Sequence, residues 1–271
     1  MAVIPVVDPD DPRLSSFRVL SDAALIRERG LFVAEGRFLV ERVLADSRFV
    51  VDALLLNDAS LAALGTALAS LPAATPVFVA ERATLEAITG VDFHRGCLAL
   101  VHRPAPVDIE AAIANTRLVV VLESVTNADN VGSVFRSAAA LGAGAVLLSP
   151  TCCDPFYRKA VRTSMGAVLQ VPSARVDPWP DALTELRAHG FTLVALSPRG
   201  SATDLDTFVS GPLPSRIALL VGTEGPGLSK SAEDAADVCV RIPMTGAVDS
   251  LNLGVAAGIV LSRLHRSHGS A

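Results

Sequence analysis

Apolar runs and amphipathic segments alternate along the first hundred residues, a pattern that predicts an α/β fold. The apolar runs have the length of buried strands, and the segments between them carry apolar residues three and four positions apart, as helices with one buried face do. The predicted strands are residues 31–36, 50–56, 76–80 and 96–102. The predicted helices are residues 37–45, 59–71 and 81–89. We therefore expect a small layered α/β domain over residues 1–103.

A proline-containing segment, residues 104–116, is the predicted linker, and the alternation resumes after it. The strand predicted at 117–124 is almost wholly apolar, which is typical of a parallel sheet covered on both faces. Further strands are predicted at residues 145–149, 167–172, 191–196, 216–222 and 237–243. Helices are predicted at residues 131–142, 158–164, 179–190 and 250–264. Residues 117–271 are thus expected to form a second domain around a parallel sheet.

Polar and glycine residues gather directly after the predicted strands of this second domain. Since ligands of parallel α/β sheets bind beyond the carboxyl ends of the strands, their recurrence there indicates a site. They include Asn127, Asn130, Gly132 and Arg136 after one strand, and Gly222, Glu224, Gly225 and Gly227 after another. Taken singly, each has a structural alternative, namely a helix cap, a surface arginine or a simple turn.

The start of the last predicted helix is unusually polar. Asp249, Ser250 and Asn252 lie together there, followed by an apolar helix. A helix cap accounts for one such residue, and asparagine inside a first turn is a mediocre helix former. We therefore predict that one side chain caps the helix and that the others face a ligand.

Composition and charge exclude several classes of protein. The net charge of −5 argues against a surface coated in positive charge for non-specific nucleic-acid binding, although a local basic patch remains compatible. The single Trp and single Tyr leave little material for a base-stacking platform. The N-terminus does not have the pattern of a signal peptide, and no apolar run is long enough to span a membrane. A cytoplasmic protein without membrane association is expected.

Metal and nucleotide motifs give little signal. The four cysteines have no zinc-like spacing, so free buried thiols and no metal site are expected. The glycines of "GTEGPGLS" lack the lysine of a phosphate-binding loop, and those of "LGAGAVLL" follow a helix and precede a strand. A dinucleotide-dependent dehydrogenase is therefore disfavoured.

Three motifs occur in a characteristic order within residues 117–264. They are Asn130-x-Gly132-x-x-x-Arg136, Gly222-x-Glu224-Gly225-x-Gly227, and Ile242-Pro243-Met244 leading to Ser250-Leu251-Asn252. Together they resemble the SpoU/TrmH family of RNA 2′-O-ribose methyltransferases, of the SPOUT class. Residues 1–103 are similar to the small substrate-binding domain of that family, mainly through "FVAEGRFLVERVLA". One departure is Ala128, where many members carry proline.

This resemblance implies a fold, a cofactor and an activity. The second domain would be a SPOUT domain with a deep trefoil knot, and the protein would be a homodimer. It would use S-adenosylmethionine to methylate a ribose 2′-hydroxyl in structured rRNA or tRNA, with rRNA slightly favoured. The alternative is a non-catalytic RNA-binding or assembly protein with the same fold.

The resemblance also implies roles for individual residues. The cofactor would be bound by Gly222, Ile242, Leu251, Met244 and Leu196. Arg136 would bind a substrate phosphate and orient the hydroxyl, since an arginine is effectively always protonated and makes a poor base.

The other motif residues would support this chemistry. Asn130 and Glu224 would hold Arg136 and the ribose, while Ser250 and Asn252 would fix the motif geometry and touch the substrate or cofactor. Two basic clusters are candidates for RNA binding, and solvated surface is the alternative for both. Their residues are Arg158, Lys159 and Arg162 in one cluster, and Arg95 with His94 and Arg103 in the other.

Overall fold

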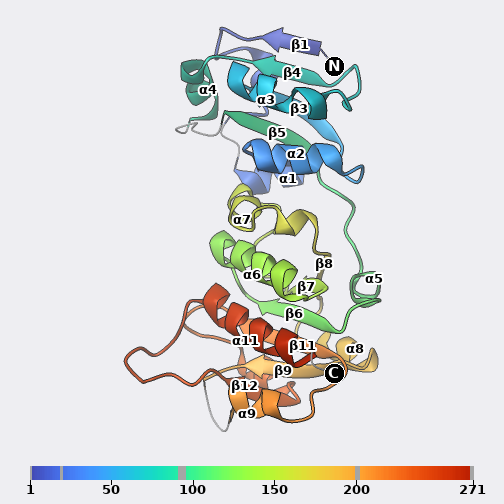
Figure 1. Ribbon diagram of the computed structural model, residues 1–271, viewed down its shortest axis with the longest axis vertical. Helices are drawn as coiled ribbons and strands as arrows, with labels where there is room; N and C mark the ends of the chain where they lie inside the picture. Colours follow the sequence, from blue (N-terminus) through green and yellow to red (C-terminus); the bar gives the residue numbers. More distant parts are fainter. Residues whose placement is uncertain (1, 19–20, 91–95, 199–201, 269–271) are drawn as a thin grey trace. The chain divides into compact units, whose positions relative to one another are not determined.

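The computed structural model describes residues 2–18, 21–90, 96–198 and 202–268. The chain divides into two compact units (Figure 1). The first consists of Met1–Ala105 with Phe156–Gly166, and the second of Pro106–Pro155 with Ala167–Ala271.

A five-stranded mixed sheet forms the first unit, in the order β1-β4-β3-β5-β2. Strands β1, β4 and β3 are parallel, and β5 runs antiparallel to both β3 and β2. The strands are β1 (Ala2–Pro5), β2 (Leu31–Glu35), β3 (Val51–Leu56), β4 (Pro76–Val79) and β5 (Cys97–His102). The helices are η1 (Pro12–Leu14), α1 (Asp22–Arg29), α2 (Arg37–Ala45), α3 (Asp58–Leu68), α4 (Arg82–Thr89) and α7 (Arg158–Thr163). All four strands and all three helices predicted between residues 31 and 102 are confirmed.

The second unit contains a seven-stranded parallel sheet in the order β10-β12-β9-β11-β6-β7-β8. The strands are β6 (Leu118–Glu123), β7 (Ala145–Leu148), β8 (Ser173–Arg175), β9 (Thr192–Leu196), β10 (Thr203–Asp204), β11 (Ile217–Gly222) and β12 (Val238–Arg241). The helices are α5 (Ile109–Ile113), α6 (Ala128–Leu141), η2 (Ala167–Leu169), α8 (Leu183–Ala188), α9 (Leu205–Ser210), α10 (Lys230–Asp234) and α11 (Leu253–His268). Every residue of β6 and β11 is buried, which explains their apolar sequences and confirms the predicted parallel sheet.

One predicted strand is wrong. Residues 167–172 were expected to be a strand, whereas the chain makes the 3₁₀ turn η2 and enters β8 only at Ser173. The strand register with β7 covers residues 173–175, and the apolar residues Ala167, Val168 and Leu169 are buried within the helical turn instead. The repeat of apolar residues in so short a run does not distinguish a strand from a buried helical turn.

Three helix starts also differ from the prediction by three residues or more, and one of them is α8, which begins at Leu183 rather than at residue 179. Helix α6 begins at Ala128 and is capped by Asn127, whose side chain accepts a hydrogen bond from the Asp129 N–H. Helix α11 begins at Leu253 rather than Ser250, and its capping residue is Asn252.

The domain boundaries of the structure differ from the predicted ones. The predicted linker, residues 104–116, contains the short helix α5, capped by Asp108. The segment 156–166, predicted to belong to the second domain, packs in the first unit, where the Phe156 ring lies 4.9 Å from the Phe32 ring. Periodicity along the chain carries no signal for such a long-range contact.

Helices α6 and α11 of the second unit lie side by side (Figure 1) and approach closely. A Cβ atom added to Gly254 would lie 2.2 Å from Ser133 Oγ, and one added to Gly258 would lie 3.4 Å from Ser137 Oγ. Small residues on both helices therefore permit the contact. Among the described residues, no helix has the length and apolar character needed to cross a membrane.

Candidate functional site

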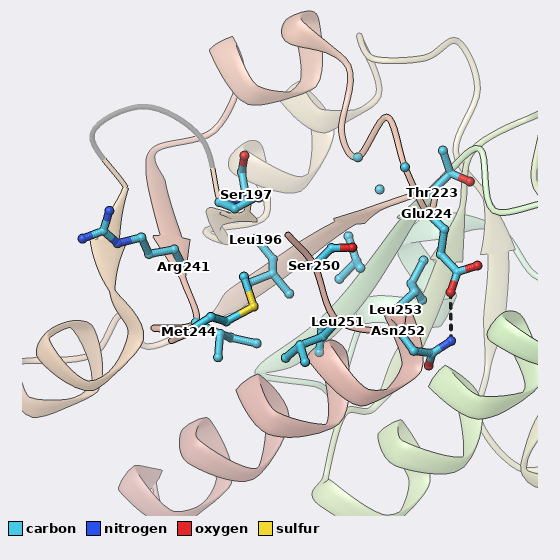
Figure 2. Close-up of a pocket in the computed structure, with 17 residues that line it drawn as sticks. Leu196, Ser197, Thr223, Glu224, Arg241, Met244, Ser250, Leu251, Asn252 and Leu253 are labelled. Atoms are coloured by element: carbon cyan, nitrogen blue, oxygen red, sulfur yellow. Dashed lines mark hydrogen bonds between the residues drawn. The ribbon is translucent and has the colours of Figure 1, made fainter. Parts of the chain in front are cut away.

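A cavity of about 400 Å³ opens at the carboxyl ends of β9, β11 and β12 (Figure 2). These three strands are neighbours in the sheet, in the order β12-β9-β11. The lining residues fall within 196–198, 221–227 and 241–256, which are the end of one strand each with the loop that follows it, and the start of α11. Its position and size suit a small-molecule site of a parallel α/β sheet.

All the residues predicted to bind a cofactor line this one cavity. They are Leu196, Gly222, Ile242, Met244 and Leu251. Three of the predicted catalytic residues, Glu224, Ser250 and Asn252, line it as well. The structure therefore brings together side chains from motifs that are far apart in the sequence.

A tight turn after β11 forms one wall, and Gly222 makes it possible. A Cβ atom on Gly222 would lie 2.1 Å from the Gly227 carbonyl carbon and 2.2 Å from the Leu228 nitrogen. The turn closes through a hydrogen bond of 3.0 Å from the Gly227 N–H to the Thr223 carbonyl. Gly227 itself has a φ of +75°, which L side chains rarely adopt. The glycines therefore shape this wall.

Asn252 joins the motifs through hydrogen bonds. Its amide nitrogen donates to Asn130 Oδ1 at 3.1 Å and to Glu224 Oε1 at 2.8 Å, the second of which Figure 2 marks with a dashed line. Its amide oxygen accepts from the Gly254 N–H at 3.0 Å and from the Val255 N–H at 3.3 Å, and so caps α11. One residue therefore caps the helix and connects two other motifs at the cavity.

The predicted pairing of Arg136 with Asn130 and Glu224 is not formed. Asn130 and Glu224 are joined through Asn252 instead, and within the described residues Arg136 has no hydrogen bond or ion pair. Arg136 is exposed on α6. Six positions along a helix correspond to roughly 9 Å of rise and about 120° of rotation away from Asn130, which explains the separation.

Ser250 and the segment before it are exposed. Ser250 lines the cavity beside Leu251 (Figure 2), and no hydrogen bond joins it to another described residue. Its hydroxyl is thus available to a ligand, whereas the helix is capped by Asn252.

The walls of the cavity are mainly apolar and carry two charged side chains, Glu224 and Arg241. Arg241 is paired with Asp204, at 2.6 Å between Nε and Oδ1, and Figure 2 shows it pointing away from the other labelled side chains. Among the described residues, Glu224 has no ion-pair partner, so its carboxylate is the uncompensated charge of the cavity wall. These walls suit a ligand with an apolar or aromatic body and a positive charge.

Glu123, at the end of β6, is a residue that the sequence interpretation missed. It is 4% exposed, and its carboxylate accepts hydrogen bonds from the Ser229 N–H at 2.8 Å, the Ser229 hydroxyl at 2.6 Å and the Trp179 indole N–H at 2.6 Å. The signal in the sequence was an acidic residue ending an otherwise apolar strand.

The basic cluster predicted to bind RNA is partly engaged inside the first unit. Arg158 Nε lies 2.8 Å from Glu35 Oε2, and Arg162 NH1 lies 3.7 Å from the same oxygen. The Arg158 N–H also donates to Asp22 at 2.9 Å, while burial raises the pKa of that carboxyl. Lys159 is exposed, and Arg95 lies outside the described residues.

The cysteines are free thiols. Burial raises the pKa of Cys97 and of Cys153 to about 12, so both thiols are neutral near pH 7. Among the residues that the structure describes, no group of three or more His, Cys, Asp or Glu side chains could hold a metal ion.

Comparison with known proteins adds a family to this geometry. The model of the SpoU rRNA Methylase family matches residues 117–262. A Mycobacterium tuberculosis protein named as an uncharacterized tRNA/rRNA methyltransferase is 42% identical over 266 residues, which are 97% of this chain and 91% of that protein.

Solved structures agree with the family match. The S-adenosylmethionine-bound crystal structure of an rRNA methyltransferase from Sinorhizobium meliloti superposes with a TM-score of 0.80 at 25% identity, covering 98% of each chain. A crystal structure described as an RNA 2′-O ribose methyltransferase gives a TM-score of 0.77 at 25% identity, covering 98% of this chain and 99% of the other.

Proposed function

Because this chain belongs to the SpoU rRNA methylase family of S-adenosylmethionine-dependent methyltransferases, we propose that it methylates a ribose 2′-hydroxyl in structured rRNA or tRNA. The observation that carries the proposal is the meeting of the three motifs at one cavity through Asn252. An apolar cavity with a carboxylate at its wall suits an adenosine body and a nearby sulfonium. The S-adenosylmethionine would be held by Gly222, Ile242, Leu251, Met244 and Leu196.

The chemistry needs alignment more than it needs a strong acid or base. When bound, S-adenosylmethionine supplies an activated methyl group. In the proposed mechanism Asn252 fixes Glu224, whose negative charge faces the cavity and stabilises positive charge there. Ser250 offers its free hydroxyl to the cofactor or the ribose, so that the 2′-oxygen is held in line with the methyl group.

Arg136 is proposed to hold the RNA. Its guanidinium is exposed and free of protein partners among the described residues, so it is available to a phosphate of the substrate. Because arginine remains protonated, it would orient the hydroxyl, and its charge would favour loss of the hydroxyl proton to solvent water, while the guanidinium would not accept that proton itself. Asn130 acts indirectly: it accepts a hydrogen bond from Asn252 and so positions that side chain.

The remaining RNA contacts are proposed from charge. Lys159 and Arg162 have exposed or half-exposed side chains, and Arg95 completes the proposed set. Arg158 is 25% exposed and paired with Glu35, so its proposed role is to hold α7 in place and to add positive charge to its surface. With a net charge of −5, binding would rely on RNA shape as well as on phosphate contacts.

The trefoil knot and the homodimer are part of the same proposal. The segment after β12 lines the cavity together with the segments after β9 and β11, and then enters α11, which packs on α6. A chain that threads past these loops in that order would form the knot. Light scattering would test the dimer, with a mass near twice 28.1 kDa expected.

A transfer assay separates this proposal from a non-catalytic RNA-binding role. Labelled S-adenosylmethionine would be incubated with rRNA and tRNA, each purified from cells lacking the protein. We expect label in one alkali-resistant dinucleotide, with rRNA the favoured pool. Absence of label in both pools, with cofactor binding intact, would favour the non-catalytic role.

A further inference from the structure

Glu123 lies opposite Gly222 in the parallel pairing of β6 and β11. Gly222 is the residue from which the cavity turn, residues 223–228, departs. The Glu123 carboxylate reaches the other end of that turn, at Ser229, where it accepts both the backbone N–H and the hydroxyl. A single buried residue therefore ties the two ends of the turn together, since its backbone pairs with Gly222 and its side chain binds Ser229.

Ser229 connects the cavity turn before it with helix α10 after it. It follows Leu228, whose nitrogen lies against Gly222, and its side-chain oxygen accepts the Ala232 N–H, which caps α10. The Trp179 indole donates to Glu123 Oε1, the oxygen that also accepts the Ser229 hydroxyl. Three donors thus converge on one carboxylate.

Burying a carboxylate is costly unless its oxygens are hydrogen-bonded, and an apolar side chain would fill the same space at lower cost. Glu123 does not line the cavity, so it has no contact with a ligand there. Its partners are a residue bordering the cavity turn and a tryptophan. The buried charge of Glu123 is therefore best explained by the hydrogen bonds through which it holds Ser229 and Trp179 in place.

We propose that Glu123 is a positioning residue for cofactor binding: by holding Ser229, it fixes the turn of residues 223–228 in the conformation that accepts S-adenosylmethionine. The inference rests on the cofactor site described above, and it does not depend on which RNA is methylated. Trp179, the single tryptophan of the chain, donates a hydrogen bond to the same carboxylate, so its fluorescence emission reports on the state of the turn.

The test compares Glu123→Gln with wild type, in full-length protein without RNA. Glutamine keeps one acceptor oxygen, so at least one of the three donors loses its partner. We expect titration calorimetry to show about tenfold weaker S-adenosylmethionine binding, since hydrogen bonds to charged groups are among the stronger ones. Amide hydrogen exchange in residues 223–229 should rise, and Trp179 emission should shift.

Glu35→Gln is the matched control, because Glu35 is also a buried glutamate, with its partners in the first unit. It should leave cofactor affinity and Trp179 emission at wild-type values. If Glu123→Gln does not fold, Ser229→Ala replaces it, with a smaller loss of about threefold expected.

A folded Glu123→Gln with wild-type cofactor affinity and unchanged exchange in residues 223–229 would overturn the proposal. A lower melting temperature with unchanged affinity would overturn it too, since it would reduce Glu123 to a stability role. Failure of RNA methylation by the wild type would refute the proposed function and leave this inference standing.

Discussion

Replacing Gly222 by alanine adds one methyl group at the most crowded point of the cavity wall. The new Cβ would lie 2.1 Å from the carbonyl carbon of Gly227, 2.3 Å from its oxygen and 2.2 Å from the nitrogen of Leu228. All three are backbone atoms, so no side chain can rotate away. The turn of residues 223–228 must move as a body.

The size of the effect follows from these distances. Non-bonded carbon atoms rest about 3.5–4.0 Å apart, so the turn must shift by more than about 1 Å. Overpacking of this kind costs about 1–3 kcal/mol. If the turn must return to its original conformation for the cofactor to bind, this free energy is lost from binding. S-adenosylmethionine affinity then falls by about 5- to 150-fold.

Titration calorimetry of folded Gly222→Ala would measure this loss directly. Gly65→Ala is the matched control, since Gly65 lies in α3 with no atom within 4 Å of its added Cβ. Alanine in a helix interior is more stable than glycine by about 0.5–1 kcal/mol, so the control should be slightly stabilised and bind cofactor normally. Wild-type affinity in folded Gly222→Ala would refute the assignment of this wall to the cofactor.

Three further predictions test other parts of the molecule. Arg136→Ala should abolish methyl transfer and leave cofactor affinity intact, because the exposed guanidinium does not line the cavity; equal loss of cofactor binding would contradict its role. Gly254→Ala should lower the free energy of unfolding in urea by about 1–3 kcal/mol, because its Cβ overlaps Ser133 at α6, whereas Gly258→Ala should cost less. Cys153, whose pKa burial raises to about 12, should react with iodoacetamide at pH 8.5 more slowly in native than in urea-unfolded protein; equal rates would show that the thiol is accessible.

Most elements of the fold were predictable because their apolar residues repeat with the period of a strand or a helix. The elements that escaped prediction lack such a signal. Strand β1 is partly exposed, and α1 buries Leu25 alone, so neither has a continuous apolar face. The attachment of residues 156–166 to the first unit depends on Phe156 and Arg158 meeting partners more than a hundred residues away, which no local pattern records.

Which residues form the candidate site could be predicted from the sequence. Motif spacing selected Gly222, Glu224 and Asn252, and the sheet order explains why they meet. Their connections were not predictable: the prediction paired Glu224 with Arg136, whereas Asn252 occupies that carboxylate. Glu123 was missed because one acidic residue at the end of a strand does not reveal three donors from two distant segments.

The composition of the cavity walls determines when, during synthesis and folding, the cavity can form. Its walls come from three segments, and the last of them in sequence, within residues 241–256, comes after β9 and β11. During synthesis the sheet strands through β11 can pair before this segment leaves the ribosome, yet no complete cavity exists until it arrives. A ligand that binds the finished cavity alone stabilises the folded state by mass action, so S-adenosylmethionine would favour seating of the last segment. Cofactor supply and completion of folding would thereby be coupled in the newly made chain.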